Sequence, residues 1–200
     1  GILWPKADDA LLDLYMTDVF KGYQKPLKIC LFGPESTGKS TLAAKLAAHY
    51  GAPFCAEYAK EYIEAQGRQL ALRDMHAIAA GQRRSEAAAQ DATKNSLLIC
   101  DTDALTTKIW SEWLFGTCPE WIAAAAKAGD YDLYLLMDID APWVDDIHRY
   151  LPDNRADFLA RCESELASQG RRYQKLSGSW DKKFTAACRA IEALRGAPKD

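Results

Sequence analysis

The chain has 200 residues, of which 48% are hydrophobic and 26% are charged, as is usual for one globular domain. Its formal net charge of −3 offers no basic field for nucleic acid, so we expect no nucleic-acid partner. No apolar run approaches the ~20 residues of a membrane-spanning helix, and the N-terminal GILWPKADDA lacks the pattern of a signal peptide. We therefore expect no association with a membrane.

The six cysteines are widely separated and include no C-x-x-C pair. Several lie in apolar runs, where a free thiol behaves as a small hydrophobe. This usage favours a reducing, cytoplasmic location over a disulfide framework, and it disfavours a zinc site, which needs clustered Cys and His.

In chain order, residues 1–26 are expected to form an N-terminal helical extension that Pro26 limits. Five short apolar runs then predict buried strands: Leu27–Phe32, Pro53–Ala56, Leu97–Cys100, Leu133–Met137 and Tyr173–Leu176. Ala-rich amphipathic stretches that predict helices separate most of them, for example Thr41–Tyr50, Leu72–Asp91 and Pro119–Ala128. Strands alternating with helices predict one three-layer α/β/α domain over residues 27–200, with a five-stranded parallel sheet covered on both faces.

The sequence LFGPESTGKST, residues 31–41, has the G-x-x-x-x-G-K-[ST] spacing of a phosphate-binding loop between a strand and a helix. Its glycines let backbone amides converge on a phosphate, and the helix N-terminus adds partial positive charge. Lys39 is placed to reach the β- and γ-phosphates, and the Ser40 hydroxyl to ligate Mg²⁺. The loop residues expected to bind the nucleotide are Gly33, Glu35, Ser36, Thr37, Gly38, Lys39, Ser40 and Thr41.

Glu57 directly follows the second predicted strand, at the sheet edge where ligands of open parallel sheets bind. A carboxylate in that place can orient an acceptor hydroxyl and take its proton, or contact sugar hydroxyls. The alternative is a helix N-terminal carboxylate that only complements the helix dipole.

Asp101 and Asp103 end the third predicted strand. If the backbone stays extended, residues two apart point to the same side. Asp101 is then expected to hold Mg²⁺ directly or through water, and Asp103 to bind the acceptor or share the role of base. The alternative is that both merely cap the next helix.

After the fourth predicted strand, residues at about 141–160 carry Arg149 and Arg155 around a Pro-Asp-Asn turn. Such a segment is typical of a lid that brings arginines to a transferring phosphate, but a solvated helical hairpin fits the residues equally well. Trp143 could fill the core or contact substrate. Arg83 and Arg84 fit either a solvated helix face or the substrate cleft.

Five segments in order, GPESTGKSTL, EYAKEY, GQR, DTDALTTK and PWVDDIHRYLPDNR, together resemble the nicotinamide riboside kinase domain of the NadR family. The resemblance spans residue 33 to about residue 155. It implies a P-loop kinase fold and transfer of the ATP γ-phosphate, with Mg²⁺, to the ribose 5′-hydroxyl of nicotinamide riboside. It also implies that Arg149 and Arg155 belong to a lid.

Two positions depart from that family pattern. Lys60 stands where an arginine is common, and Lys lacks the planar two-pronged donor geometry of Arg. Ala56 stands near the place where an aromatic residue would help to sandwich the nicotinamide ring. Tyr58, Tyr62 or Trp143 is expected to supply that ring contact, because a cationic pyridinium favours aromatic faces and carboxylates.

Three functions compete. A nicotinamide riboside kinase is favoured, with catalytic roles for Lys39, Glu57, Asp101, Asp103 and the two lid arginines. A kinase for another nucleoside or nucleotide would share these parts and differ in its ring pocket. A regulatory module that binds ATP without acceptor-dependent turnover would leave the acidic residues unexplained.

Overall fold

A parallel sheet forms the centre of the molecule in the computed structural model, which describes residues 25–92, 97–140 and 154–196. Its strands are β1 (Leu27–Phe32), β2 (Phe54–Cys55), β3 (Leu97–Asp101), β4 (Leu133–Met137) and β5 (Tyr173–Leu176). They lie in the order β2-β3-β1-β4-β5, and every pair is parallel. The predicted five-stranded sheet is therefore confirmed, with β2 shorter and β3 one residue longer than expected.

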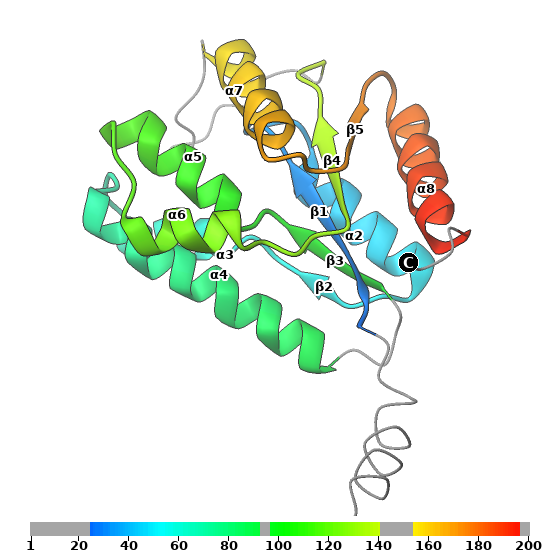
Figure 1. Ribbon diagram of the computed structural model, residues 1–200, viewed down its shortest axis with the longest axis horizontal. Coiled ribbons are helices and arrows are strands. Elements are labelled where there is room, and N and C mark those ends of the chain that lie inside the picture. Colours follow the sequence, from blue (N-terminus) through cyan, green and yellow to red (C-terminus); the bar gives the residue numbers. More distant parts are fainter. Residues whose placement is uncertain (1–24, 93–96, 141–153, 197–200) are drawn as a thin grey trace, which may run out of the picture.

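Seven helices connect and cover the strands within the described residues (Figure 1). They are α2 (Lys39–Tyr50), α3 (Tyr58–Gln66), α4 (Leu72–Ala92), α5 (Ala104–Phe115), α6 (Glu120–Lys127), α7 (Arg155–Ser168) and α8 (Trp180–Gly196). One core cluster joins α2 and α8 to one face of the sheet, and a second joins α5, α6 and α7 to the other face. This arrangement confirms the three-layer α/β/α prediction.

The period-two pattern of β1 explains why both faces are covered. Ile29 and Leu31 enter the core on the α2 and α8 side, whereas Cys30 and Phe32 enter the core on the α5 to α7 side. All four are fully buried, as expected for a strand with no solvated face. The six cysteines, Cys30 among them, are free thiols.

The sheet order brings the functional segments together. From β1 the chain goes to the β2 edge, returns through β3 beside β1, and then crosses to β4 on the other side. Such a reversal opens a crevice at the carboxyl ends of the central strands, where ligands of open α/β sheets bind. The phosphate loop follows β1, Glu57 follows β2, and Asp101 ends β3.

Two predicted segments fall largely outside the described residues: the N-terminal helix in residues 1–24 and residues 141–153 of the predicted lid. Residues 154–160 of that lid are described and lead into α7. There Phe158 is 1% exposed and belongs to the core, so this end of the predicted lid is part of the packed domain. Of the described helices, none is both long and apolar enough to cross a membrane.

Candidate active site

Two glycines give the phosphate loop its shape. Gly33 has φ 124° and lies against β4, where an added Cβ would meet the carbonyl oxygen of Met137 at 3.0 Å. Gly38 has φ 83°, and an added Cβ would come within 1.9 Å of the Trp180 indole. Both positions need the φ values that glycine adopts without strain, so the loop geometry depends on them.

Polar side chains stabilise the phosphate loop by donating hydrogen bonds to its backbone carbonyls. Lys39 is 8% exposed, and its Nζ donates to the Pro34 carbonyl at 2.7 Å. Thr37 Oγ1 donates to the same carbonyl at 2.9 Å. From the start of α7, Arg155 Nη1 donates to the Ser36 carbonyl at 3.2 Å. Two of the predicted cationic residues therefore meet at this loop, while Arg149 lies outside the described residues.

Ser40 and Asp101 also meet. Ser40 Oγ donates to Asp101 Oδ2 at 2.5 Å, which joins the start of α2 to the end of β3. The other carboxylate oxygen, Asp101 Oδ1, is buried and has no hydrogen-bond partner. A buried carboxylate oxygen without a partner beside a hydroxyl suits a hard divalent cation such as Mg²⁺, which binds through one or two carboxylates plus substrate phosphates. Among the described residues, no group of three or more His, Cys, Asp or Glu side chains is arranged so that it could hold a metal ion by itself.

The Asp103 side chain does not join Asp101 and Ser40, because the backbone between Asp101 and Asp103 is not extended. Thr102 has φ 68°, which turns the chain after β3. Asp103 Oδ1 then accepts from the backbone N–H of Thr106 at 3.0 Å as the N-cap of α5, and Oδ2 accepts from the Tyr134 hydroxyl at 2.7 Å. These contacts are those of the capping alternative, and Asp103 is not among the residues that line the cavity described below.

Glu57 faces the phosphate loop. It is the N-cap residue of α3, yet its side chain makes no capping hydrogen bond and is 15% exposed. Burial and the nearby charge of Asp101 raise the pKa of this carboxyl, while Lys39 and Lys60 oppose the rise. A carboxyl with a raised pKa in a cleft is better suited to accept a proton than an ordinary surface glutamate is.

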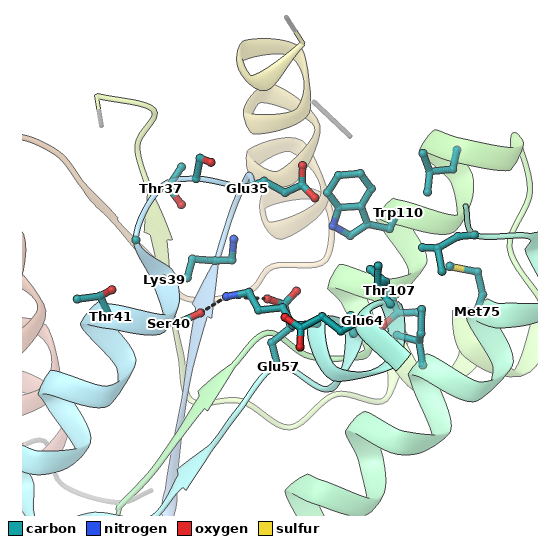
Figure 2. A pocket seen from close by; sticks show the side chains of 18 residues that line it. Glu35, Thr37, Lys39, Ser40, Thr41, Glu57, Glu64, Met75, Thr107 and Trp110 are labelled. Atoms are coloured by element: carbon teal, nitrogen blue, oxygen red, sulfur yellow. Dashed lines mark hydrogen bonds and ion pairs between the residues drawn. The ribbon is translucent and has the colours of Figure 1, made fainter. Parts of the chain in front are cut away.

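A cavity of about 230 Å³ runs from the phosphate loop to an apolar end. In Figure 2, Lys39 and Ser40 lie at one end, Trp110 and Met75 at the other, and Glu57 between them. The residues that line it are Glu35, Ser36, Thr37, Gly38, Lys39, Ser40, Thr41, Glu57, Ala59, Lys60, Ile63, Glu64, Leu70, Met75, Ile78, Thr107, Trp110 and Leu114. All eight expected phosphate-loop residues except Gly33 are in this set.

The two tyrosines proposed to hold the ring lie on another face of α3. An added Cβ at Gly81 would come within 2.0 Å of the Tyr58 ring, so this ring packs directly on α4. The Tyr62 hydroxyl donates to Asp74 Oδ1 at 2.8 Å, also on α4. Neither tyrosine lines the cavity, and Trp143 lies outside the described residues. The positions of Tyr58 and Tyr62 therefore disfavour them as ring contacts, whereas the ring contact of Trp143 stays a prediction.

Sequence reasoning missed Trp110 and Glu64, which line the cavity. Trp110 packs on Phe158 with ring centroids 4.4 Å apart, which fixes its indole at the apolar end. Helical spacing could have found it: Thr107, Trp110 and Leu114 follow one another by three and four residues and so share one face of α5.

Gln82 was also missed, although it lies in the GQR segment. It is 2% exposed; its Oε1 accepts from the backbone N–H of Tyr58 at 2.9 Å, and its Nε2 donates to the Thr102 carbonyl at 3.4 Å. This amide therefore ties the start of α3 to the turn after β3. Arg83 and Arg84 are exposed, in agreement with a solvated face.

Comparison with known proteins places this chain in a family. The model of a family described as "AAA domain" matches residues 28–183. The chain is 31% identical over 176 residues to the trifunctional NAD biosynthesis/regulator protein NadR of Escherichia coli (strain K12). That alignment covers 84% of this chain and 42% of the relative, so the chain spans less than half of its length.

Solved structures support the fold. A NadR protein in complex with NR superposes with a TM-score of 0.76 at 22% identity, covering 97% of this chain and 61% of that one. Thymidylate kinase from Candida albicans superposes with a TM-score of 0.64 at 17% identity, covering 86% and 93%. Both share the α/β fold described above.

Proposed function

The chain belongs to the AAA domain family, and we propose that its NadR-type P-loop kinase domain is a nucleoside kinase. More specifically, we propose that it uses ATP and Mg²⁺ to phosphorylate nicotinamide riboside on the ribose 5′-hydroxyl. The products are nicotinamide mononucleotide and ADP. The observation that carries this proposal is one cavity with a phosphate loop at one end, a tryptophan at the other, and a carboxylate between them.

The phosphate end of the cavity would bind the donor. Backbone amides of residues 36–41 and the α2 N-terminus favour the β-phosphate. Lys39 would leave the Pro34 carbonyl for the phosphates, and Arg155 lies close enough to the loop to stabilise charge on the transferring group. Mg²⁺, held by Ser40 and by Asp101 directly or through water, would neutralise charge on the β- and γ-phosphates.

The middle of the cavity would hold the reacting hydroxyl. Glu57 has no capping bond to restrain it, faces the loop, and has a raised pKa. We propose that its carboxylate orients the 5′-hydroxyl and accepts its proton as the oxygen bonds to the γ-phosphorus and ADP leaves. Asp103 fits this role less well, since both of its oxygens already accept hydrogen bonds away from the cavity.

The apolar end would hold the base. Trp110 offers a fixed indole and Glu64 a carboxylate, which together favour a cationic ring such as pyridinium. An acceptor that already carries a phosphate would react through that phosphate and place it beside the γ-phosphate, so the apolar end would bind only the base of either kind of acceptor. Among the described residues that line the cavity there is no arginine, and both lysines lie toward the phosphate loop. The NadR structure in complex with NR supports the same choice of acceptor.

The test is acceptor-dependent ADP release with ATP and Mg²⁺. The panel contains nicotinamide riboside, uridine, thymidine, thymidine monophosphate and a control without acceptor. Turnover with nicotinamide riboside far above the others supports the proposal. Preference for another nucleoside would retain the kinase and refute its substrate, and ADP release independent of any acceptor would refute both. In Glu57→Gln, kcat should fall by about 10²–10⁴-fold with nucleotide affinity preserved.

A further inference from the structure

Lys60 makes a contact that the proposed chemistry does not explain. It lies in the first turn of α3, and its side chain is 57% exposed. Its ammonium nonetheless reaches across the cavity to donate to Ser40 Oγ. An exposed lysine gains little from a neutral acceptor, so the surroundings of that hydroxyl must attract the charge.

The surroundings are anionic. Ser40 Oγ donates in turn to Asp101 Oδ2 at 2.5 Å, and Glu57 Oε2 lies 3.6 Å from the Lys60 ammonium. Figure 2 shows Ser40 and Glu57 facing the same space. The ammonium therefore contacts one hydroxyl and one carboxylate, and a second carboxylate, Asp101, is bonded to that hydroxyl; Ser40 and Asp101 are the same groups that suit a divalent cation.

We propose that Lys60 is a tethered cation that takes the place of the metal in the nucleotide-free protein and is displaced when Mg²⁺ enters with the nucleotide. This inference rests on the nucleotide site of the proposed function. Both cations need the Ser40 oxygen, so they cannot bind it together. The lysine is suited to leave: its charge is compact, its stem is flexible, and its exposed side chain can return to solvent at small cost.

Two other roles for Lys60 make different predictions. A permanent phosphate ligand would stabilise the nucleotide equally with and without metal. A simple surface ion pair with Glu57 three residues before it would affect neither state, since exposed pairs contribute little. A displaceable cation instead supports the phosphates only when Mg²⁺ is absent. The metal dependence of nucleotide affinity therefore separates the three.

The experiment titrates a non-hydrolysable ATP analogue into the protein by calorimetry, once in excess EDTA and once in excess Mg²⁺. In Lys60→Met we expect affinity in EDTA to fall roughly tenfold, because a cation near several phosphate charges is lost. Affinity in Mg²⁺ should stay within about threefold or improve. Lys60→Arg should retain most of the EDTA affinity, and Lys127→Met, at an exposed position on α6, is the control.

Equal losses in EDTA and Mg²⁺ would overturn the inference in favour of a permanent phosphate ligand. No change in either condition would overturn it in favour of a surface ion pair. If the unsubstituted protein failed to bind the analogue with or without Mg²⁺, the proposed kinase function itself would be refuted. In the two outcomes above the protein still binds the analogue, and only the inference about Lys60 is refuted.

Discussion

Replacing Asp103 tests whether this aspartate stabilises the fold or takes part in catalysis. Its carboxylate caps α5 through the Thr106 N–H and accepts from the buried Tyr134 hydroxyl. Loss of an N-cap costs ~1 kcal/mol, and a buried hydroxyl without a partner costs about 1–3 kcal/mol. Asp103→Ala should therefore lower the free energy of unfolding by about 2–4 kcal/mol.

Asp103→Asn separates charge from hydrogen bonding. Asn caps helices about as well as Asp, and its amide can still pair with the Tyr134 hydroxyl. Burial raises the pKa of the Asp103 carboxyl, so removing its charge costs the fold little. We expect the free energy of unfolding of Asp103→Asn to lie within about 1 kcal/mol of that of the unsubstituted protein. Its KM for the acceptor should be unchanged.

Asp101→Asn provides the matched comparison, since the same change is made two residues away. Asp101 faces Ser40 and has one buried oxygen without a partner, so we expect a loss of at least ~10²-fold in kcat with little loss of stability. Urea unfolding and steady-state kinetics on the three variants make the measurement. A folded Asp103→Asn protein with kcat reduced as severely as in Asp101→Asn would refute the scaffold role.

Three further predictions concern the surroundings of the site. Trp110→Leu keeps apolar bulk but removes the aromatic face, so the acceptor KM should rise about 3–10-fold while the KM for ATP stays unchanged in steady-state assays. Gly81→Ala would bring a methyl group within 2.0 Å of the Tyr58 ring; calorimetry should show a loss of about 1–2 kcal/mol, and kcat should fall as α3 shifts. Burial and the charge of Asp103 raise the pKa of Glu86 from 4.5 to about 7. The native state then binds more protons than the unfolded state, so stability should fall by up to about 3 kcal/mol as pH rises from 4.5 to 7; Glu86→Gln should remove this fall in urea unfolding at pH 5 and pH 8.

Hydrophobic patterning predicted the fold well because β1, β3 and β4 are short, mostly apolar runs. β1, β4 and β5 begin and end at the predicted residues. The weaker case is β2, where only Phe54 and Cys55 pair with β3, since pairing depends on tertiary contacts that the sequence does not display.

The site was harder to predict because it depends on one backbone angle and on helix faces. Alternation places Asp101 and Asp103 on one side, but the positive φ of Thr102 separates them, and nothing in a threonine indicates that conformation. Tyr58 and Tyr62 are aromatic and follow Glu57 by one and five residues, so chemistry alone favoured them as ring contacts. Gly81 was the overlooked signal: a glycine inside a helix allows the Tyr58 ring to pack on α4.

Helix α4 connects Glu57 and Asp101 with the apolar end of the cavity, although α4 carries none of the groups proposed to react. Gln82 holds the N–H of Tyr58, next to Glu57, and the carbonyl of Thr102, next to Asp101, so one buried amide sets the spacing between the proposed proton acceptor and the proposed metal ligand. Met75 and Ile78 precede it by seven and four residues and line the apolar end of the cavity. Since all three share one helix face, a shift of α4 moves base recognition and catalytic geometry together. Changes along this face should therefore alter KM for the acceptor and kcat jointly, unlike changes at Trp110.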